Sequence, residues 1–232
     1  MKNKCIVGVF GTANTGKTTF INDLVEKTSS LENPLDRWTV FGKNYRDEIT
    51  KRGLKINRDG NEECQQVIHD VLVGNIIDAV NYKEQGNLIM DRTVIDSFVY
   101  TYWHYRFGTA KINPDTIDRM WNQVVRYTKL FDILLYIPLD KCEDVIVVDD
   151  KFRDVNYTYR NQIDSIMKSV WHHLLDTGNN VNVIYGSRET RVDTFMNVIV
   201  YKNNNERKSK YSIDKFNSLV NEISNERGLW RN

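Results

Sequence analysis

Short apolar runs alternate along the chain with longer stretches in which apolar residues recur three or four positions apart. The short runs are rich in β-branched and aromatic residues, which is typical of strands buried on both faces, and the longer spacing predicts helices. The predicted strands are 4–10, 37–41, 87–90, 132–137 and 181–185. The predicted helices are 17–27, 61–80, 93–105, 113–130 and 157–175.

This alternation predicts an α/β fold in which a parallel sheet of about five strands carries helices on both faces. It continues to about residue 186, so we assign residues 1–192 to one domain. Residues 193–232 form a polar C-terminal extension, in which apolar residues at helical spacing predict a helix over 212–226.

Composition narrows the class of protein. The 232 residues carry 32 Lys and Arg against 31 Asp and Glu, a net charge of +1 that argues against a general nucleic-acid binder. The three cysteines are an odd number and widely spaced, which argues against a disulfide framework. They also show no zinc-binding spacing, which argues against a zinc site. The apolar run 5–10 is too short for a membrane span or a signal sequence. We therefore expect a cytoplasmic protein without a membrane partner.

Residues 11–18 read GTANTGKT and match the phosphate-loop pattern G-x-x-x-x-G-K-[ST] between a strand and a helix. Gly11 and Gly16 allow a tight turn in which backbone N–H groups converge on phosphates. Lys17 would place its charge between the β- and γ-phosphates, and Thr18 would offer its hydroxyl to Mg²⁺. The pattern predicts a P-loop NTPase three-layer sandwich with ATP and Mg²⁺ as cofactors. The expected nucleotide-binding residues are Gly11, Thr12, Ala13, Asn14, Thr15, Gly16, Lys17, Thr18 and Thr19.

Asp91 and Arg92 directly follow the third predicted strand, and ligands of open α/β sheets bind beyond the carboxyl ends of strands. Asp91 could organise Mg²⁺ or accept a proton from a substrate hydroxyl. Arg92 could bind a phosphate with two hydrogen bonds. The alternative is a helix N-terminus with a salt-bridged arginine.

A third group of charges lies near residues 149–160, where Arg153 and Arg160 could form a lid over the transferred phosphate. We place this lid at about 145–160, and the alternative is a solvated run of charges. For the acceptor we predict contacts from Tyr45, Arg46, Gln65 and Gln66, in addition to Arg92. For the two glutamines, a solvent-facing position is the alternative. Arg188 and Arg191 follow the last strand, either near the adenine or on the surface.

Taken together, five segments resemble a family of P-loop proteins that is common in phages and described as AAA-domain or thymidylate-kinase-like. They occur in the family's order, over residues 4–192: GTANTGKT, DRTVIDSFVYT (91–101), YIPL (136–139), DDKFR (149–153) and YGSRETR (185–191). The family is similar to nicotinamide riboside kinases and deoxynucleoside kinases. If a phage encodes the chain, the compartment would be the host cytoplasm.

The resemblance implies roles for individual residues. Lys17 and Thr18 would bind ATP phosphates and Mg²⁺, Asp91 would be the base or the metal-organising carboxylate, and Arg92 would bind a phosphate. Arg153 and Arg160 would be lid arginines. One feature departs from deoxynucleoside kinases, which carry a glutamate base after the second strand. Residues 41–46 read FGKNYR, so the first acid there is Asp47.

These observations predict phosphoryl transfer from ATP to a small nucleoside or nucleotide. One alternative is a kinase acting on a nucleic-acid end or a modified DNA base, which the near-zero net charge disfavours. Another is a nucleotide-gated module that binds a partner. The sequence leaves open whether the acceptor is a nucleoside or a monophosphate, and a homodimer is considered as the oligomeric state.

Overall fold

The computed structural model of the chain describes residues 4–141 and 154–204. Contacts divide the chain into residues 1–192 and 193–232, and the sheet lies in the first unit. Of the second unit the structure describes residues 193–204, which continue a helix that begins at Arg188. The helix expected over 212–226 and most of the expected lid lie outside the described residues.

Five parallel strands form the single described sheet, in the order β2-β3-β1-β4-β5. Burial of complete strands such as β1 and β4 explains their unbroken apolar runs, since helices cover both faces. The parallel five-stranded sheet predicted from the sequence is therefore confirmed. The strands are β1 (Ile6–Phe10), β2 (Trp38–Val40), β3 (Asn87–Asp91), β4 (Ile133–Tyr136) and β5 (Val181–Val183).

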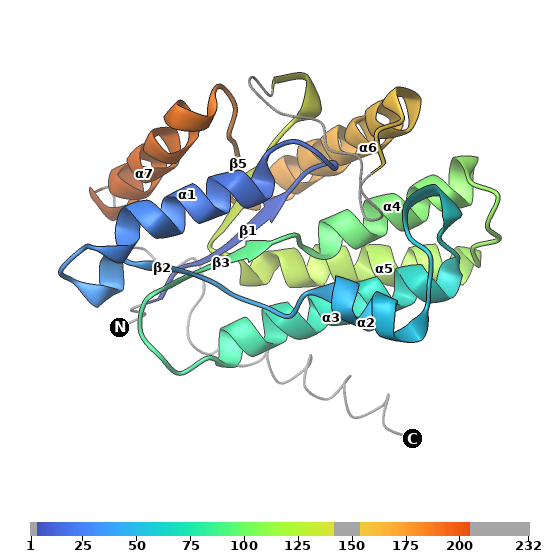
Figure 1. The fold of residues 1–232 in the computed structure, drawn as a ribbon, viewed down its shortest axis with the longest axis horizontal. Helices are drawn as coiled ribbons and strands as arrows, with labels where there is room; N and C mark the ends of the chain where they lie inside the picture. The colour runs from blue at the N-terminus through green and yellow to red at the C-terminus, as the bar shows by residue number, and fades with distance from the viewer. Residues whose placement is uncertain (1–3, 142–153, 205–232) are drawn as a thin grey trace. The chain divides into compact units, whose positions relative to one another are not determined.

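Helices cover the sheet in two layers. Figure 1 shows α1 along one face and α3, α4 and α5 together on the other, which confirms the three-layer sandwich. None of the described helices combines the length and the apolarity needed to span a bilayer. The helices are α1 (Lys17–Ser29), α2 (Tyr45–Arg52), α3 (Glu62–Asn81), α4 (Val94–Phe107), α5 (Pro114–Tyr127), α6 (Tyr157–Asp176) and α7 (Arg188–Asn204).

Two helices were not predicted from the sequence. The first, α2, has eight residues and buries only Ile49, so its apolar spacing is too sparse to detect. Local signals fix its ends instead. Asn44 caps it by accepting a hydrogen bond from the Arg46 N–H, and Gly53 ends it in the left-handed conformation. The second, α7, includes residues 193–204, which the sequence analysis placed in the polar extension.

The strand order brings the two sequence motifs together. β1 lies at the centre, between β3 and β4, and Val9 pairs with Asp91 in the parallel register. The Arg92 N–H then donates to the Val9 carbonyl at 3.0 Å. Gly11 is two residues beyond Val9, so the phosphate loop and Asp91 emerge side by side at the carboxyl edge of the sheet, where ligands bind in open α/β folds.

Candidate active site

The phosphate loop connects β1 to α1 and has backbone geometry that requires glycine at both ends. Gly11 has φ +152°, and a Cβ there would meet the Ile137 carbonyl oxygen at 2.5 Å. Gly16 has φ +81° and is the N-cap of α1. The N-terminus of α1 therefore opens onto the loop and adds its partial positive charge.

Lys17 lies over this loop and is buried. Its Nζ donates hydrogen bonds to the carbonyls of Gly11 at 2.8 Å and Thr12 at 2.6 Å. The ammonium group is thus held close to the backbone of the loop, in a position from which it can contact a phosphate bound there. Thr19, the last residue of the predicted nucleotide site, is exposed on the first turn of α1.

Thr18 and Asp91 meet in space although 73 residues separate them in the chain. The Thr18 hydroxyl donates a hydrogen bond to Asp91 Oδ2 at 2.5 Å. Thr18 is exposed and Asp91 half-buried, so both oxygens are accessible from solvent. A hydroxyl and a carboxylate oxygen are hard donors of the type that Mg²⁺ prefers.

Arg92 follows Asp91 in an unusual backbone conformation. Its φ of +86° is rare for a residue other than glycine and stores strain of about 1–3 kcal/mol. The guanidinium lies 5.9 Å from the Tyr45 ring centre, 5.8 Å from that of Tyr100 and 3.4 Å from Asp96 Oδ1. Burial acts to lower the pKa of Arg92, but these neighbours outweigh it and raise the pKa well above its ordinary value. Arg92 therefore stays cationic.

Asp96 is a buried carboxylate that the sequence analysis missed. It accepts a hydrogen bond from the Thr93 N–H at 2.8 Å and a long one from the Gly11 N–H at 3.4 Å. Burial raises its pKa, while Arg92 and Lys17 act to lower it. Thr93 and Asp96 form a capping box at the start of α4, a pattern that could have been found in the sequence.

Tyr100 is the second residue that the sequence analysis missed. Its hydroxyl accepts a hydrogen bond from the Ala13 N–H at 3.2 Å, and its ring faces Arg92. Tyr100 thereby links the phosphate loop to the acceptor side of the site. No spacing rule could identify it, because one aromatic residue on an apolar helix resembles any other.

The predicted lid arginines differ in what can be said of them. Arg160 lies in the first turn of α6, is buried, and its Nη2 donates to the Asn14 carbonyl of the phosphate loop at 3.2 Å. Arg153 lies outside the described residues. Residues 157–160, the end of the expected lid, belong to α6.

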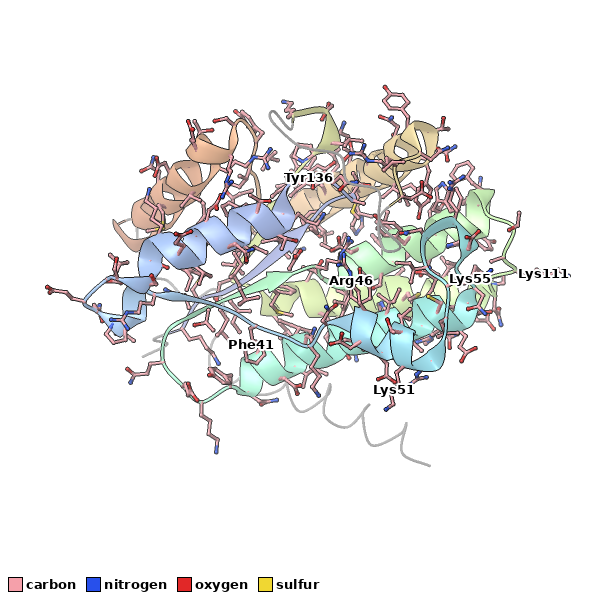
Figure 2. The ribbon with its side chains drawn as sticks, in the orientation of Figure 1. Phe41, Arg46, Lys51, Lys55, Lys111 and Tyr136 are labelled. Atoms are coloured by element: carbon pink, nitrogen blue, oxygen red, sulfur yellow. The ribbon has the colours of Figure 1, made fainter. Side chains whose placement is uncertain are left out.

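The predicted acceptor residues come from two helices. Tyr45 and Arg46 begin α2, and Arg46 lies on its inner side, whereas Lys51 points away from the molecule (Figure 2). Gln65 is buried against Thr101 of α4, so a solvent-facing position is wrong for it. Gln66 instead contacts Thr116 of α5, because successive helical residues point about 100° apart. Asp47, the first acid after the second strand, is exposed on the first turn of α2.

A comparison with known protein families shows to which family the chain belongs. A family model described as an AAA domain matches residues 7–142. The chain belongs to this AAA-domain family. The match includes the phosphate loop, Asp91 and Arg92, and it ends before Arg160. No curated protein sequence matches the chain significantly.

Solved structures of two kinases and of the NadR protein share the fold of this AAA-domain protein. The deoxyadenosine kinase of M. mycoides with its products dCMP and dCDP has a TM-score of 0.58 at 14% identity, covering 85% of this chain and 100% of that chain. The thymidylate kinase of Candida albicans has a TM-score of 0.59 at 14% identity, covering 87% and 93%. The NadR protein in complex with NAD and AMP-PNP has a TM-score of 0.58 at 15% identity, covering 90% of this chain but 52% of that one.

Proposed function

We propose that this chain is an ATP- and Mg²⁺-dependent kinase that phosphorylates a small nucleoside or nucleotide. The observation that carries the proposal is the hydrogen bond between Thr18 and Asp91, 2.5 Å long, with Arg92 at the next position. This hydrogen bond supports the proposal that Thr18 and Asp91 together bind Mg²⁺ beside the phosphate loop and Arg92. Phosphoryl transfer uses a phosphate-binding loop, a metal ion that neutralises charge and a further cation.

The residues present fit Mg²⁺. Thr18 Oγ1 and Asp91 Oδ2 are both oxygen donors, and the exposure of Thr18 leaves room for the water ligands that Mg²⁺ retains. When bound, Mg²⁺ would neutralise charge on the β- and γ-phosphates. Thr18 would contact it directly, and Asp91 would do so directly or through a water molecule.

The side chains of the loop would then stabilise the transfer itself. An acceptor oxygen attacks the γ-phosphorus, the bond to the bridging β–γ oxygen breaks, and ADP leaves with that electron pair. Lys17 would follow the charge as it moves onto the leaving oxygen. We propose Arg160 and Arg153 as further cations of the site. Arg160 would add its charge through its contact with the Asn14 carbonyl of the loop, and Arg153 would neutralise the equatorial oxygens and exclude water.

Arg92 favours a monophosphate as the acceptor. It is cationic, it lies beside Asp91, and Tyr45 and Tyr100 flank the guanidinium, which also forms an ion pair with Asp96 at 3.4 Å. A guanidinium carries five N–H donors, so this ion pair leaves donors for a phosphate. A phosphate oxygen is already anionic and needs no strong base, which suits a site where Asp91 is engaged by Thr18. Tyr45 and Arg46 would contact the remainder of the acceptor, whereas Gln65 is only 2% exposed and is held by Thr101. The shared fold with thymidylate kinase and deoxyadenosine kinase supports an acceptor of the nucleoside or nucleotide class.

A panel of acceptors tests the proposal. The full chain would be incubated with MgATP and nucleosides, nucleoside monophosphates, nicotinamide riboside or DNA oligomers, and products resolved by mass. We expect a phosphorylated small molecule that Lys17→Ala abolishes and the exposed Lys27→Ala on the same helix leaves unchanged. Phosphorylation of DNA alone would favour the nucleic-acid alternative. ATP hydrolysis without any phosphorylated acceptor would favour a nucleotide-gated module.

A further inference from the structure

Two buried arginines, one in α6 and one in α7, contact the phosphate loop from the C-terminal part of the domain. Arg191, in the first turn of α7, is 3% exposed, and its Nη1 donates to the Thr15 carbonyl at 2.8 Å. Its Nε donates to the Gly186 carbonyl, just after β5, at 2.9 Å. Arg160 is 8% exposed and its Nη2 donates to the preceding loop carbonyl, that of Asn14, at 3.2 Å.

Neither guanidinium is neutralised within residues 4–141 and 154–204. The described ion pairs include no carboxylate partner for Arg160 or Arg191. Arg160 Nε and Arg191 Nη2 are also buried without a hydrogen-bond partner. A buried charge is costly unless it is paired, so two such charges beside one loop indicate a role connected with that loop.

The planar peptide bond links each of these carbonyl contacts to the direction of the next N–H group in the loop. In a trans peptide, the carbonyl and the N–H of the same plane point in opposite directions. A donor that holds the Thr15 carbonyl from outside therefore fixes the direction of the Gly16 N–H. The contact of Arg160 with the Asn14 carbonyl fixes the Thr15 N–H in the same way. Both N–H groups belong to the stretch that would bind phosphate.

We infer that Arg191 is a positioning residue, which holds the phosphate loop with the Gly16 N–H aimed at the nucleotide phosphates. It acts through the Thr15 carbonyl and ties that carbonyl to the turn after β5. Its positive charge also polarises the peptide and strengthens the N–H as a donor. The inference rests on the proposed function, because it concerns the site at which ATP would bind.

Arg188 provides a matched control on the same helix. Its guanidinium forms a two-point ion pair with Asp23 of α1, at 2.6 and 2.8 Å, and the Arg188 side chain is 66% exposed. It contacts no residue of the loop. Arg188→Ala therefore removes an arginine from the first turn of α7 without touching the Thr15 carbonyl.

Calorimetry with MgADP and with inorganic tripolyphosphate tests the inference on the full chain. We expect Arg191→Ala to raise the Kd of both ligands by about 10–100-fold, the range for a lost charged hydrogen bond. Arg191→Lys should lose less, because an ammonium can reach one of the two carbonyls. Arg188→Ala should bind like the wild type. The acceptor KM should not change in any of the three variants, and added methylguanidinium should restore part of the binding to Arg191→Ala.

The outcomes separate the two proposals. If the wild type binds neither ligand, the proposed function fails and the inference fails with it. If the wild type binds and Arg191→Ala binds equally well, the inference alone is wrong. It is also wrong if Arg191→Ala and Arg191→Lys raise the acceptor KM as much as they weaken MgADP, since that result indicates general damage to the fold.

Discussion

The phosphate loop occupies the consecutive residues 11–18, whereas the residues around Arg92 come from the three separate elements α2, β3 and α4. On the phosphate side, two glycines shape the backbone between a strand and a helix, and the side chain of one lysine lies over that backbone. On the acceptor side, Tyr45, Tyr100 and Asp96 are brought to Arg92 by packing of helices against the sheet. The residues of the first arrangement are consecutive in the sequence, although Arg160 and Arg191 contact its backbone from α6 and α7, whereas the second arrangement is assembled from separate elements.

Because of this difference, substitutions on the two sides should change different measured properties. A change in the loop should impair nucleotide chemistry and leave the fold intact, because few long-range contacts are lost. A change on the acceptor side should alter acceptor affinity, and it can be produced indirectly by loosening α3 against α4. Substitutions on each side, and at the boundary between the two sides, test this separation.

Lys17→Ala should produce the largest loss. Removing the cation that follows charge onto the leaving oxygen should lower kcat by about 10³–10⁵-fold, the range for a single transition-state cation in phosphoryl transfer. The thermal midpoint should change little. Steady-state kinetics together with thermal unfolding measure both quantities. A variant with normal turnover would show that residues 11–18 are not a catalytic phosphate loop.

Asp91 lies between the phosphate loop and Arg92, so Asp91→Asn tests the boundary between the two sides. The substitution keeps size and hydrogen bonding but weakens the metal ligand and removes basicity, so kcat should fall by roughly 10²–10⁴-fold. If Asp91 organises Mg²⁺, the Mg²⁺ concentration for half-maximal rate should rise in the same variant. An unchanged Mg²⁺ requirement with a large loss of kcat would instead assign Asp91 the role of base. Asp36→Asn, on an exposed turn, is the control.

Arg92→Ala should affect the acceptor side alone. Loss of a charged phosphate contact should raise the KM of a monophosphate acceptor by about 10–100-fold, with a much smaller effect on the affinity for MgADP. The exposed Arg52→Ala on α2 should change neither quantity. Equal losses of acceptor and nucleotide affinity in Arg92→Ala would break the proposed separation of the two sides.

The smallest effect concerns the support of the acceptor side at acid pH. His69 of α3 is buried between Ser97 Oγ, at 2.8 Å, and Gln123 Oε1, at 2.9 Å. Burial lowers the pKa of His69 to about 4, against the opposing effect of the Gln123 hydrogen bond. The unfolded chain binds this proton near pH 6.5, so between pH 6.5 and 4 the unfolded state holds more protons. Stability should therefore fall as the pH decreases through this window.

Urea unfolding at pH 7 and pH 5 measures this contribution. Integrating the two pKa values, His69 should account for about 2 kcal/mol of the loss in unfolding free energy between these pH values. His69→Gln keeps a polar side chain that does not titrate, so its loss should be smaller by that amount. Identical pH dependences of the two proteins would show that His69 does not contribute to acid sensitivity.

The sheet and the phosphate loop could be predicted because their determinants are close together in the sequence. Strands buried on both faces appear as unbroken apolar runs, as in β1 and β4. The loop is defined by glycine conformations and one lysine within residues 11–18. The helix α2 was not predicted, because it buries only one residue, Ile49, and one residue cannot form a periodic pattern.

The remainder of the site was decided by tertiary structure. Asp91 and Thr18 could be assigned to one edge of the sheet, but only the Val9–Asp91 register brings their oxygens together. Gln65 and Gln66 are equivalent in the sequence, and only the packing of α3 turns one toward α4 and the other toward α5. Arg191 could be placed after the last strand, but its contact with the Thr15 carbonyl depends on where β5 lies in the sheet. Hydrophobic spacing and backbone conformation act over a few residues, so the sequence alone was enough to predict the five strands, the five longer amphipathic or buried helices and the phosphate loop, but not α2 or α7. Contacts between distant side chains depend on strand order and helix packing, which no local pattern encodes.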